Sequence, residues 1–140
     1  MQTVGIDIGT TTISGVVLEK NGTQKPRILK AKTIENGSFL TTTKDWERIQ
    51  DAEKIVKKSR QMLDDFLDEY PEVEKIGLTG QMHGIVYIDK EGKCVSPLYT
   101  WQDARGSLSG KDNGSLTEEI RQTCSVQAPS GYGMVTHIKN

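Results

Sequence analysis

The sequence has no long apolar run, and this limits its possible relations to a membrane. No hydrophobic stretch approaches the roughly 20 residues that a membrane-spanning helix needs. Residues 1–20 also lack the pattern of a secretory signal peptide. We therefore expect a cytoplasmic protein with no membrane partner.

An excess of charge of one sign is also missing. The chain has 18 Lys and Arg residues against 19 Asp and Glu residues, and its net charge is -1. No overall electrostatic field then favours binding to nucleic acid or to a membrane surface. Cysteine is scarce, and Cys94 and Cys124 have no metal-type spacing. A disulfide between them is possible, but without an export signal reduced thiols are the expected state.

Glycine, in contrast, is frequent, and the glycines fall beside chemically active residues. The 140 residues include 14 glycines, whereas only 6% are aromatic. This composition suits turns and close approaches of the backbone to other groups. The length corresponds to one domain, which should bury about two-thirds of its unfolded surface.

The opening stretch predicts a hairpin with a polar tip. Apolar residues alternate with glycine and aspartate along residues 4–9, which is the period of a β-strand. The chain then turns at Gly9 and three threonines, and a second apolar run follows at residues 13–18. Backbone N–H groups at such a tip can converge on an anion. Asp7 repels a bare phosphate, so it fits there with a metal ion or metal-bound water between them. The alternative is an ordinary hairpin whose turn is rich in threonine.

The periodicity of the chain predicts a mixed α/β domain. Strands are expected at residues 2–8, 12–19 and 27–35 in antiparallel meander order, with an Asn-Gly turn before the third. A long amphipathic helix is expected from Asp45 to Tyr70, capped by Thr42, Thr43 or Asp45 and stopped by Pro71.

Further strands and helices follow that helix. A fourth strand at residues 73–79 should lie parallel to its sheet neighbour, because a helix crossover precedes it. A fifth strand is expected at residues 85–89. A Gly/Ser loop at residues 106–114 should lead into a short helix, which begins with a capping box at residues 115–118 and ends near Cys124. Another helix could begin at Met134.

The fourth strand runs into a polar segment with glycine on both sides, Gly-Gln-Met-His-Gly at residues 80–84. Open α/β folds bind ligands at the carboxyl ends of their strands. The flanking glycines allow Gln81 and His83 to reach into a cleft and bind a polar small molecule. A lone histidine is more often a satisfied structural residue, and metal binding is not expected, because His137 has no partner pattern. Met82 can pack under the strand.

A second polar cluster, Trp-Gln-Asp-Ala-Arg, occupies residues 101–105. Asp103 and Arg105 can accept and donate hydrogen bonds to hydroxyl groups, and Trp101 offers a flat apolar wall. Recognition of a polyol needs this combination. The alternative is a structural Asp103–Arg105 salt bridge beside a buried tryptophan.

Taken in order, residues 5–11, 80–84 and 101–105 resemble the amino-terminal part of a carbohydrate kinase of the FGGY family. The resemblance is to its xylulokinases and sedoheptulokinases. The segment Ser-Gly-Tyr-Gly-Met at residues 130–134, followed by Thr136, favours sedoheptulokinase, and the Gln-Met-His segment argues against glycerol kinase. Three motifs in the family's order are far more specific than one.

This resemblance implies a ribonuclease-H-like fold, as in the actin-like ATPases: a mixed sheet with flanking helices, here as an incomplete domain. Residues 1–140 would be the amino-terminal part of a two-domain sugar kinase that lacks its carboxy-terminal domain, and a homodimer is possible. The implied activity of the full-length protein is ATP-dependent phosphorylation of a ketose like xylulose or sedoheptulose, with Mg²⁺. A non-catalytic sugar-binding or regulatory module is the alternative. An actin- or chaperone-like ATPase is a weaker one, because the sugar-type segments speak against it.

The resemblance also implies roles for single residues. The family's glycine-threonine hairpin faces the ATP phosphates, which carries over to Gly9, Thr10, Thr11 and Thr12, and to Asp7, which would hold the metal through water. Its sugar-binding segments carry over to Gln81, Met82, His83, Trp101, Asp103 and Arg105. The hairpin and the two sugar segments should line one cavity.

Two departures from the family pattern stand out. Ser14 occupies a position that is usually basic, which puts in doubt a cationic contribution near the phosphates. No catalytic residue is expected within these 140 residues, since the family's catalytic aspartate lies further along. Asp103 is the one carboxylate well placed as a base, but Arg105 beside it would hold its pKa low. We therefore expect the isolated chain to be inactive.

Overall fold

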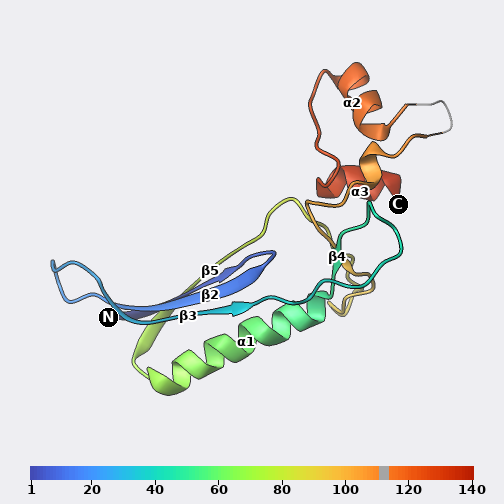
Figure 1. The fold of residues 1–140 in the computed structure, drawn as a ribbon. Coiled ribbons are helices and arrows are strands. Elements are labelled where there is room, and N and C mark those ends of the chain that lie inside the picture. Colours follow the sequence, from blue (N-terminus) through green and yellow to red (C-terminus); the bar gives the residue numbers. More distant parts are fainter. Residues whose placement is uncertain (111–113) are drawn as a thin grey trace. The chain divides into compact units, whose positions relative to one another are not determined.

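The computed structural model describes residues 1–110 and 114–140, and these residues form two compact units. Unit 1 contains Met1–Gly37 and Glu53–Gln81, and unit 2 contains Ser38–Ala52 and Met82–Asn140. The ribbon in Figure 1 follows the chain through both units, each of which is described by itself.

Unit 1 is built on a four-stranded mixed sheet. Its strands are β1 (Gln2–Ile8), β2 (Thr12–Glu19), β3 (Arg27–Glu35) and β5 (Val73–Gly80), in the order β3-β2-β1-β5. The first three strands form an antiparallel meander, and β5 lies parallel to β1. The predicted meander and the parallel return strand are both confirmed. Because β1 and β5 run in the same direction, Ile8 and Gly80 end them at the same edge of the sheet.

Helix α1 (Ala52–Glu69) covers one face of this sheet and forms the core with it (Figure 1). The buried core consists of Val4, Ile6, Ile13, Val17, Met62 and Phe66. Gly15 of β2 lies directly under the helix. A Cβ atom there would come within 2.4 Å of a Phe66 ring carbon and 2.8 Å of the Met62 sulfur. The absence of a side chain at Gly15 therefore sets how closely α1 approaches the sheet.

The predicted start of the long helix is wrong. The helix begins at Ala52 rather than Asp45, and the residues before it form a turn and the short strand β4 (Ile49–Gln50), which pairs with β6 (Leu98–Tyr99). Tertiary hydrogen bonds account for the difference, since backbone groups at Trp46 and Arg48 bind residues 100–104. The helical period of the sequence includes Ile49, but this residue pairs with Tyr99 of β6 instead of joining the helix.

The helix caps also differ from the prediction. None of the three predicted capping residues begins a helix, and the Thr42 hydroxyl donates instead to Glu47. Val56 lies at a position of the helix's apolar period, but it is 58% exposed. The face that packs on the sheet carries Ile55, Met62 and Phe66.

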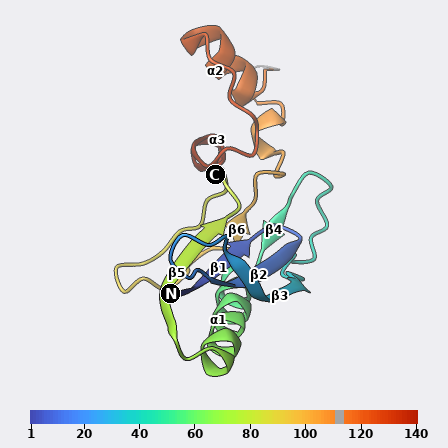
Figure 2. The same cartoon turned by 90° about the vertical axis from the view of Figure 1, so that its left-hand side faces the viewer.

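Unit 2 contains little regular structure before its helices (Figure 2). The predicted strand at residues 85–89 is reduced to isolated bridges, Ile85 with Tyr99 and Ile88 with Cys94. Between them the Tyr87 N–H donates to the hydroxyl of Ser96 rather than to a backbone carbonyl, which interrupts the ladder. Cys94 and Cys124 are both free thiols, as expected.

The two helices predicted for the last part of the chain are confirmed. Helix α2 (Leu116–Cys124) has Ser115 as its N-cap, whose hydroxyl accepts a hydrogen bond from the Glu118 N–H. Helix α3 covers Gly133–Lys139. Within the predicted Gly/Ser loop, the structure has a short 3-10 turn, η1 (Arg105–Ser107), and residues 111–113 lie outside the described part. Among the described helices, none combines the length and apolar character that crossing a bilayer requires.

Candidate functional site

The predicted phosphate turn joins β1 to β2 in unit 1. The Gly9 N–H donates to the Thr12 carbonyl (2.9 Å), which closes the turn. A Cβ atom on Gly9 would lie 2.9 Å from that same carbonyl oxygen, so a side chain would push the turn open. Gly9 is therefore required by the turn itself, whatever the turn binds.

Two residues from other strands brace this turn. The buried Asn36, which follows β3, donates from its side chain to the Gly9 carbonyl (2.7 Å) and from its N–H to the Thr11 carbonyl (2.8 Å). Gln81, which follows β5, donates from its N–H to the Ile8 carbonyl (2.9 Å) and accepts from the Thr10 hydroxyl at 2.7 Å. The turn is thus held on both sides by groups distant in sequence, which makes its shape rigid.

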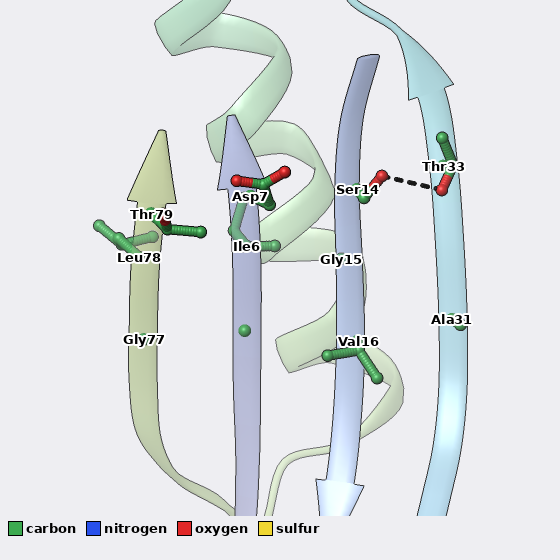
Figure 3. Close-up of a pocket in the computed structure, with 11 residues that line it drawn as sticks. Ile6, Asp7, Ser14, Gly15, Val16, Ala31, Thr33, Gly77, Leu78 and Thr79 are labelled. Atoms are coloured by element: carbon green, nitrogen blue, oxygen red, sulfur yellow. Dashed lines mark hydrogen bonds between the residues drawn. The ribbon is translucent and has the colours of Figure 1, made fainter. Parts of the chain in front are cut away.

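Asp7 lies just before the turn in a row of polar side chains across the sheet. Its Cα partners are Thr79 of β5 on one side and Ser14 of β2 on the other, and Ser14 in turn pairs with Thr33 of β3. Residues that pair across a sheet share a face. Figure 3 shows the Asp7 carboxylate between Thr79 and Ser14, on the face that α1 does not cover. A hollow of about 500 Å³ lies along this face, lined largely by glycine and other small residues.

Ser14 stands where the family pattern has a basic residue. Its hydroxyl forms a hydrogen bond with the Thr33 hydroxyl at 2.9 Å (Figure 3). The second strand therefore offers hydroxyl groups beside Asp7, and no cationic side chain, at this position.

The Asp103–Arg105 pair lies in unit 2 and is buried, with relative exposures of 1% and 7%. One carboxylate oxygen of Asp103 accepts from the Arg105 N–H (3.1 Å) and Nε (2.7 Å). The other accepts from Arg105 Nη2 (3.1 Å) and the Arg48 N–H (3.0 Å). These four contacts use the acceptor positions that a carboxylate has. A sugar hydroxyl can bind Asp103 only if one of them opens.

Arg105 extends this pair into a network. Its guanidinium also contacts Glu47 (3.4 Å) and the Asn140 side chain, and it lies over the rings of Tyr99 and Trp46. The tryptophan ring under the Arg105 guanidinium is Trp46, whereas Trp101, the tryptophan of the predicted cluster, is 51% exposed and so not the buried tryptophan of the alternative. The network ties together the segments around residues 47, 100 and 140.

The charge of Asp103 is stabilised by these partners. Burial by itself raises the pKa of Asp103, but hydrogen bonds from the Arg105 side chain and from the Arg48 and Arg105 backbone outweigh it. The pKa of Asp103 is held below its usual value, as the sequence suggested. A carboxylate with a lowered pKa is a weak general base.

The other predicted sugar-binding side chains of unit 2 are open to solvent. Met82 is 70% exposed and Trp101 is 51% exposed. His83 is also exposed, and its backbone has a φ of 69°, which is rare for a residue other than glycine. Its imidazole ring stacks on the ring of Tyr132, with a centroid separation of 4.3 Å and an interplanar angle of 9°.

The predicted site residues thus fall into two groups. Asp7, the turn residues and Gln81 belong to unit 1, whereas Met82, His83, Trp101, Asp103 and Arg105 belong to unit 2. The expectation that both groups line one cavity stays a prediction, as do the ligands assigned to each residue. Among the described residues, no three His, Cys, Asp or Glu side chains gather as a metal site.

Three residues near these groups were missed from the sequence. The Asn-Gly pair at residues 36–37 predicts a turn after the third strand, but it does not indicate that the Asn36 side chain braces another turn. Thr79 could have been found from strand register, because a parallel partner places it beside Asp7. Tyr132 carried a signal in its flanking glycines, but nothing in the sequence indicates its stack with His83.

A comparison with protein families gives the site its context. Residues 2–136 match the N-terminal domain model of the FGGY family of carbohydrate kinases. The chain belongs to this family. The expected fold is confirmed as well: the solved xylulose kinase from Lactobacillus acidophilus superposes with a TM-score of 0.70 at 19% identity, over 86% of this chain and 22% of that one.

Similar FGGY kinases include enzymes for two ketoses. The chain is 31% identical to a xylulose kinase of Staphylococcus xylosus over 78% of its own length and 22% of that protein. It is 29% identical to a mouse sedoheptulokinase over 96% of its own length and 31% of that protein. The chain therefore spans about a fifth to a third of the length of these relatives.

Proposed function

We propose that the protein to which this FGGY domain belongs transfers the γ-phosphoryl group of ATP to a hydroxyl of a ketose like xylulose or sedoheptulose. The observation that carries the proposal is the braced turn after β1, with Asp7 at its entrance and Gln81 bonded to Thr10 (2.7 Å). One hydrogen bond in this turn therefore joins Thr10, which is assigned to the phosphates, to Gln81, which is assigned to the sugar. The names of the two ketose kinase relatives support the substrate class.

In this proposal the turn of unit 1 faces the nucleotide phosphates. Phosphoryl transfer depends mainly on positioning and on stabilisation of charge. Asn36 and Gln81 hold Gly9, Thr10 and Thr11 in place before any ligand binds, so little ordering entropy remains to be lost. The hydroxyl groups of Thr11 and Thr12 are the donors proposed for the phosphate oxygens, because the Thr10 hydroxyl already donates its hydrogen to Gln81.

Asp7 fits a role at Mg²⁺ through bound water. Mg²⁺ prefers oxygen ligands, keeps several waters and commonly uses one or two carboxylates together with phosphates. The exposed Asp7 carboxylate, with the Thr79 and Ser14 hydroxyls as neighbours in register, provides oxygen donors of this kind. When bound, the ion would neutralise charge on the phosphates, while Asp7 orients its water shell.

The residues of the two sugar-type segments are proposed to bind the sugar. Gln81 and His83 supply hydrogen-bonding side chains, and Met82 and Trp101 supply exposed apolar surface. Asp103 and Arg105 are proposed to bind hydroxyls as well, though their mutual contacts must first rearrange. We assign no general base within this chain, because the lowered pKa of Asp103 makes it a weak one.

Calorimetry on the 140-residue chain tests the proposal. Xylulose and sedoheptulose are titrated with and without ATP and Mg²⁺, and we expect binding of at least one ketose. Asp7→Asn should abolish any effect of Mg²⁺-ATP and leave ketose binding intact. Asp64→Asn is the matched control, because Asp64 is exposed on α1, which covers the opposite face of the sheet. Failure of both ketoses to bind, to this chain and to the longest product of its gene, would overturn the proposal.

A non-catalytic sugar-binding module is the second candidate. Ser14 favours this candidate, because a serine bonded to Thr33, and not a basic residue, occupies the position beside Asp7. Ketose binding that is indifferent to ATP and Mg²⁺, in this chain and in the longest product of its gene, would support the module. Binding that tightens with nucleotide would support the kinase.

A further inference from the structure

Tyr132 lies in a short segment that contacts both predicted sugar-binding segments of unit 2. This segment, residues 130–133 (Ser-Gly-Tyr-Gly), is called the SGYG segment below. A Cβ atom on Gly131 would lie 1.8 Å from the Trp101 carbonyl oxygen, and one on Gly133 would lie 3.0 Å from the Gly84 carbonyl oxygen. The SGYG segment therefore packs, backbone against backbone, on the residues next to His83 and on Trp101 itself.

The backbone of Tyr132 is fixed by hydrogen bonds. Its N–H donates to the Pro129 carbonyl (3.0 Å), and its carbonyl accepts from the Thr136 N–H (2.9 Å) at the start of α3. Ser130 adds a further tie, since its hydroxyl accepts from the Ser107 N–H at 3.1 Å. A ring on such a fixed backbone has few orientations to lose when it contacts a neighbour.

His83 needs a partner of this kind. Its φ of 69° is a strained conformation for a non-glycine residue, and such strain persists where the surroundings over-determine it. The Tyr132 ring covers one face of the imidazole, at 4.3 Å and nearly parallel. The stack leaves the edge of the imidazole, where both nitrogens lie, to make hydrogen bonds in the plane of the ring.

We propose that Tyr132 is a positioning residue for sugar binding, which fixes the plane of the His83 imidazole so that one ring nitrogen meets a ketose hydroxyl. This inference rests on the proposed function. It assigns to the SGYG segment the task of holding His83 and Trp101 in one arrangement. A stack that served only stability would leave sugar affinity unchanged when it is removed without unfolding the chain.

Nuclear magnetic resonance of the histidine rings tests this directly, because the chain has only two histidines. His137 is the internal reference, and its Nδ1 lies 3.0 Å from the Tyr87 hydroxyl. The ring protons of His83 and His137 are recorded in the wild-type 140-residue chain, in Tyr132→Phe and in Tyr132→Leu. Each protein is then titrated with xylulose and sedoheptulose while the His83 signals are followed.

We expect Tyr132→Leu to remove the ring-current shift of His83, to leave His137 unchanged, and to weaken ketose binding about tenfold. Tyr132→Phe keeps an aromatic face, so it should retain both the ring-current shift of His83 and the ketose affinity. If Tyr132→Leu also disturbs His137, the nuclear Overhauser effect between the Tyr132 and His83 rings in the wild type decides whether the stack exists.

The outcomes separate the inference from the proposed function. A His83 signal that does not respond to Tyr132→Leu, or an unchanged affinity in that variant, overturns the positioning role alone. If neither the wild-type chain nor the longest product of its gene binds a ketose, the proposed function is overturned, and the positioning role with it.

Discussion

The backbone of His83 adopts a left-handed conformation that costs a non-glycine residue about 1–2 kcal/mol. We predict that His83→Gly is more stable than His83→Ala by about 1 kcal/mol, since both lose the stack on Tyr132 and only glycine relieves the strain. Urea denaturation of the two variants measures the difference. At Glu119, exposed in helix α2, the same pair of substitutions should give the opposite order. An alanine variant of His83 as stable as the glycine variant would refute the strain.

Asp103 makes the stability of the chain depend on pH in the acid range. Its folded-state pKa is lowered, so its ionised form stabilises the fold above the usual aspartate pKa, and this contribution is lost as pH falls through the folded-state pKa. We predict that Asp103→Asn costs about 3–5 kcal/mol at neutral pH, because Arg105 keeps its burial and loses the nearer of its two carboxylate partners. The difference in unfolding free energy between the wild type and Asp103→Asn should shrink below about pH 4. Denaturation curves at several pH values measure this, and a deficit that stays constant with pH would contradict it. Asp45→Asn, at an exposed site, is the control.

At the scale of elements, the local sequence pattern predicts a helix or strand well where the segment's conformation does not depend on distant residues. Strands β1, β2 and β3 follow from alternation and from the turns between them, and α2 follows from its capping box. The stretch from Asp45 to Gln50 does not, because pairing with Leu98–Tyr99 and hydrogen bonds accepted by the Trp46 and Arg48 carbonyls override its helical period. Such partners are fifty residues away in the sequence, so no local window contains them.

The contact between α1 and β2 depends on a single missing side chain. We predict that Gly15→Ala destabilises the chain by about 1–3 kcal/mol, because its Cβ would overlap Phe66 and Met62. Gly77→Ala, on β5, is the matched control, since the nearest atom to its Cβ would be 3.9 Å away. That substitution should be neutral or stabilise by up to about 1 kcal/mol. Urea denaturation compares them, and equal effects of the two would show that helix packing does not explain Gly15.

For the whole molecule, the sequence motifs predict the family and the fold, while the structure adds how the candidate groups are supported. Asn36 braces the turn after β1, and the ring of Tyr132 stacks on that of His83. Asn36 lies outside the family motifs, and the SGYG segment around Tyr132 indicates a relative but no chemical role. Their contacts depend on strand register and on backbone packing between glycines, which a single sequence does not specify.

The chemistry of its carboxylates argues that this chain alone does not transfer phosphate. Asp103 has all four acceptor positions in use and a lowered pKa, and Asp7 is proposed for the metal. We predict no ADP release above background when the 140-residue chain is mixed with Mg²⁺-ATP and xylulose or sedoheptulose in a coupled assay. The Asp7→Asn variant controls for contaminating kinases, since their activity would survive in it. Turnover by the wild type at the roughly 1–100 s⁻¹ typical of kinases, lost in Asp7→Asn, would mean that a base for the sugar hydroxyl lies within these residues after all.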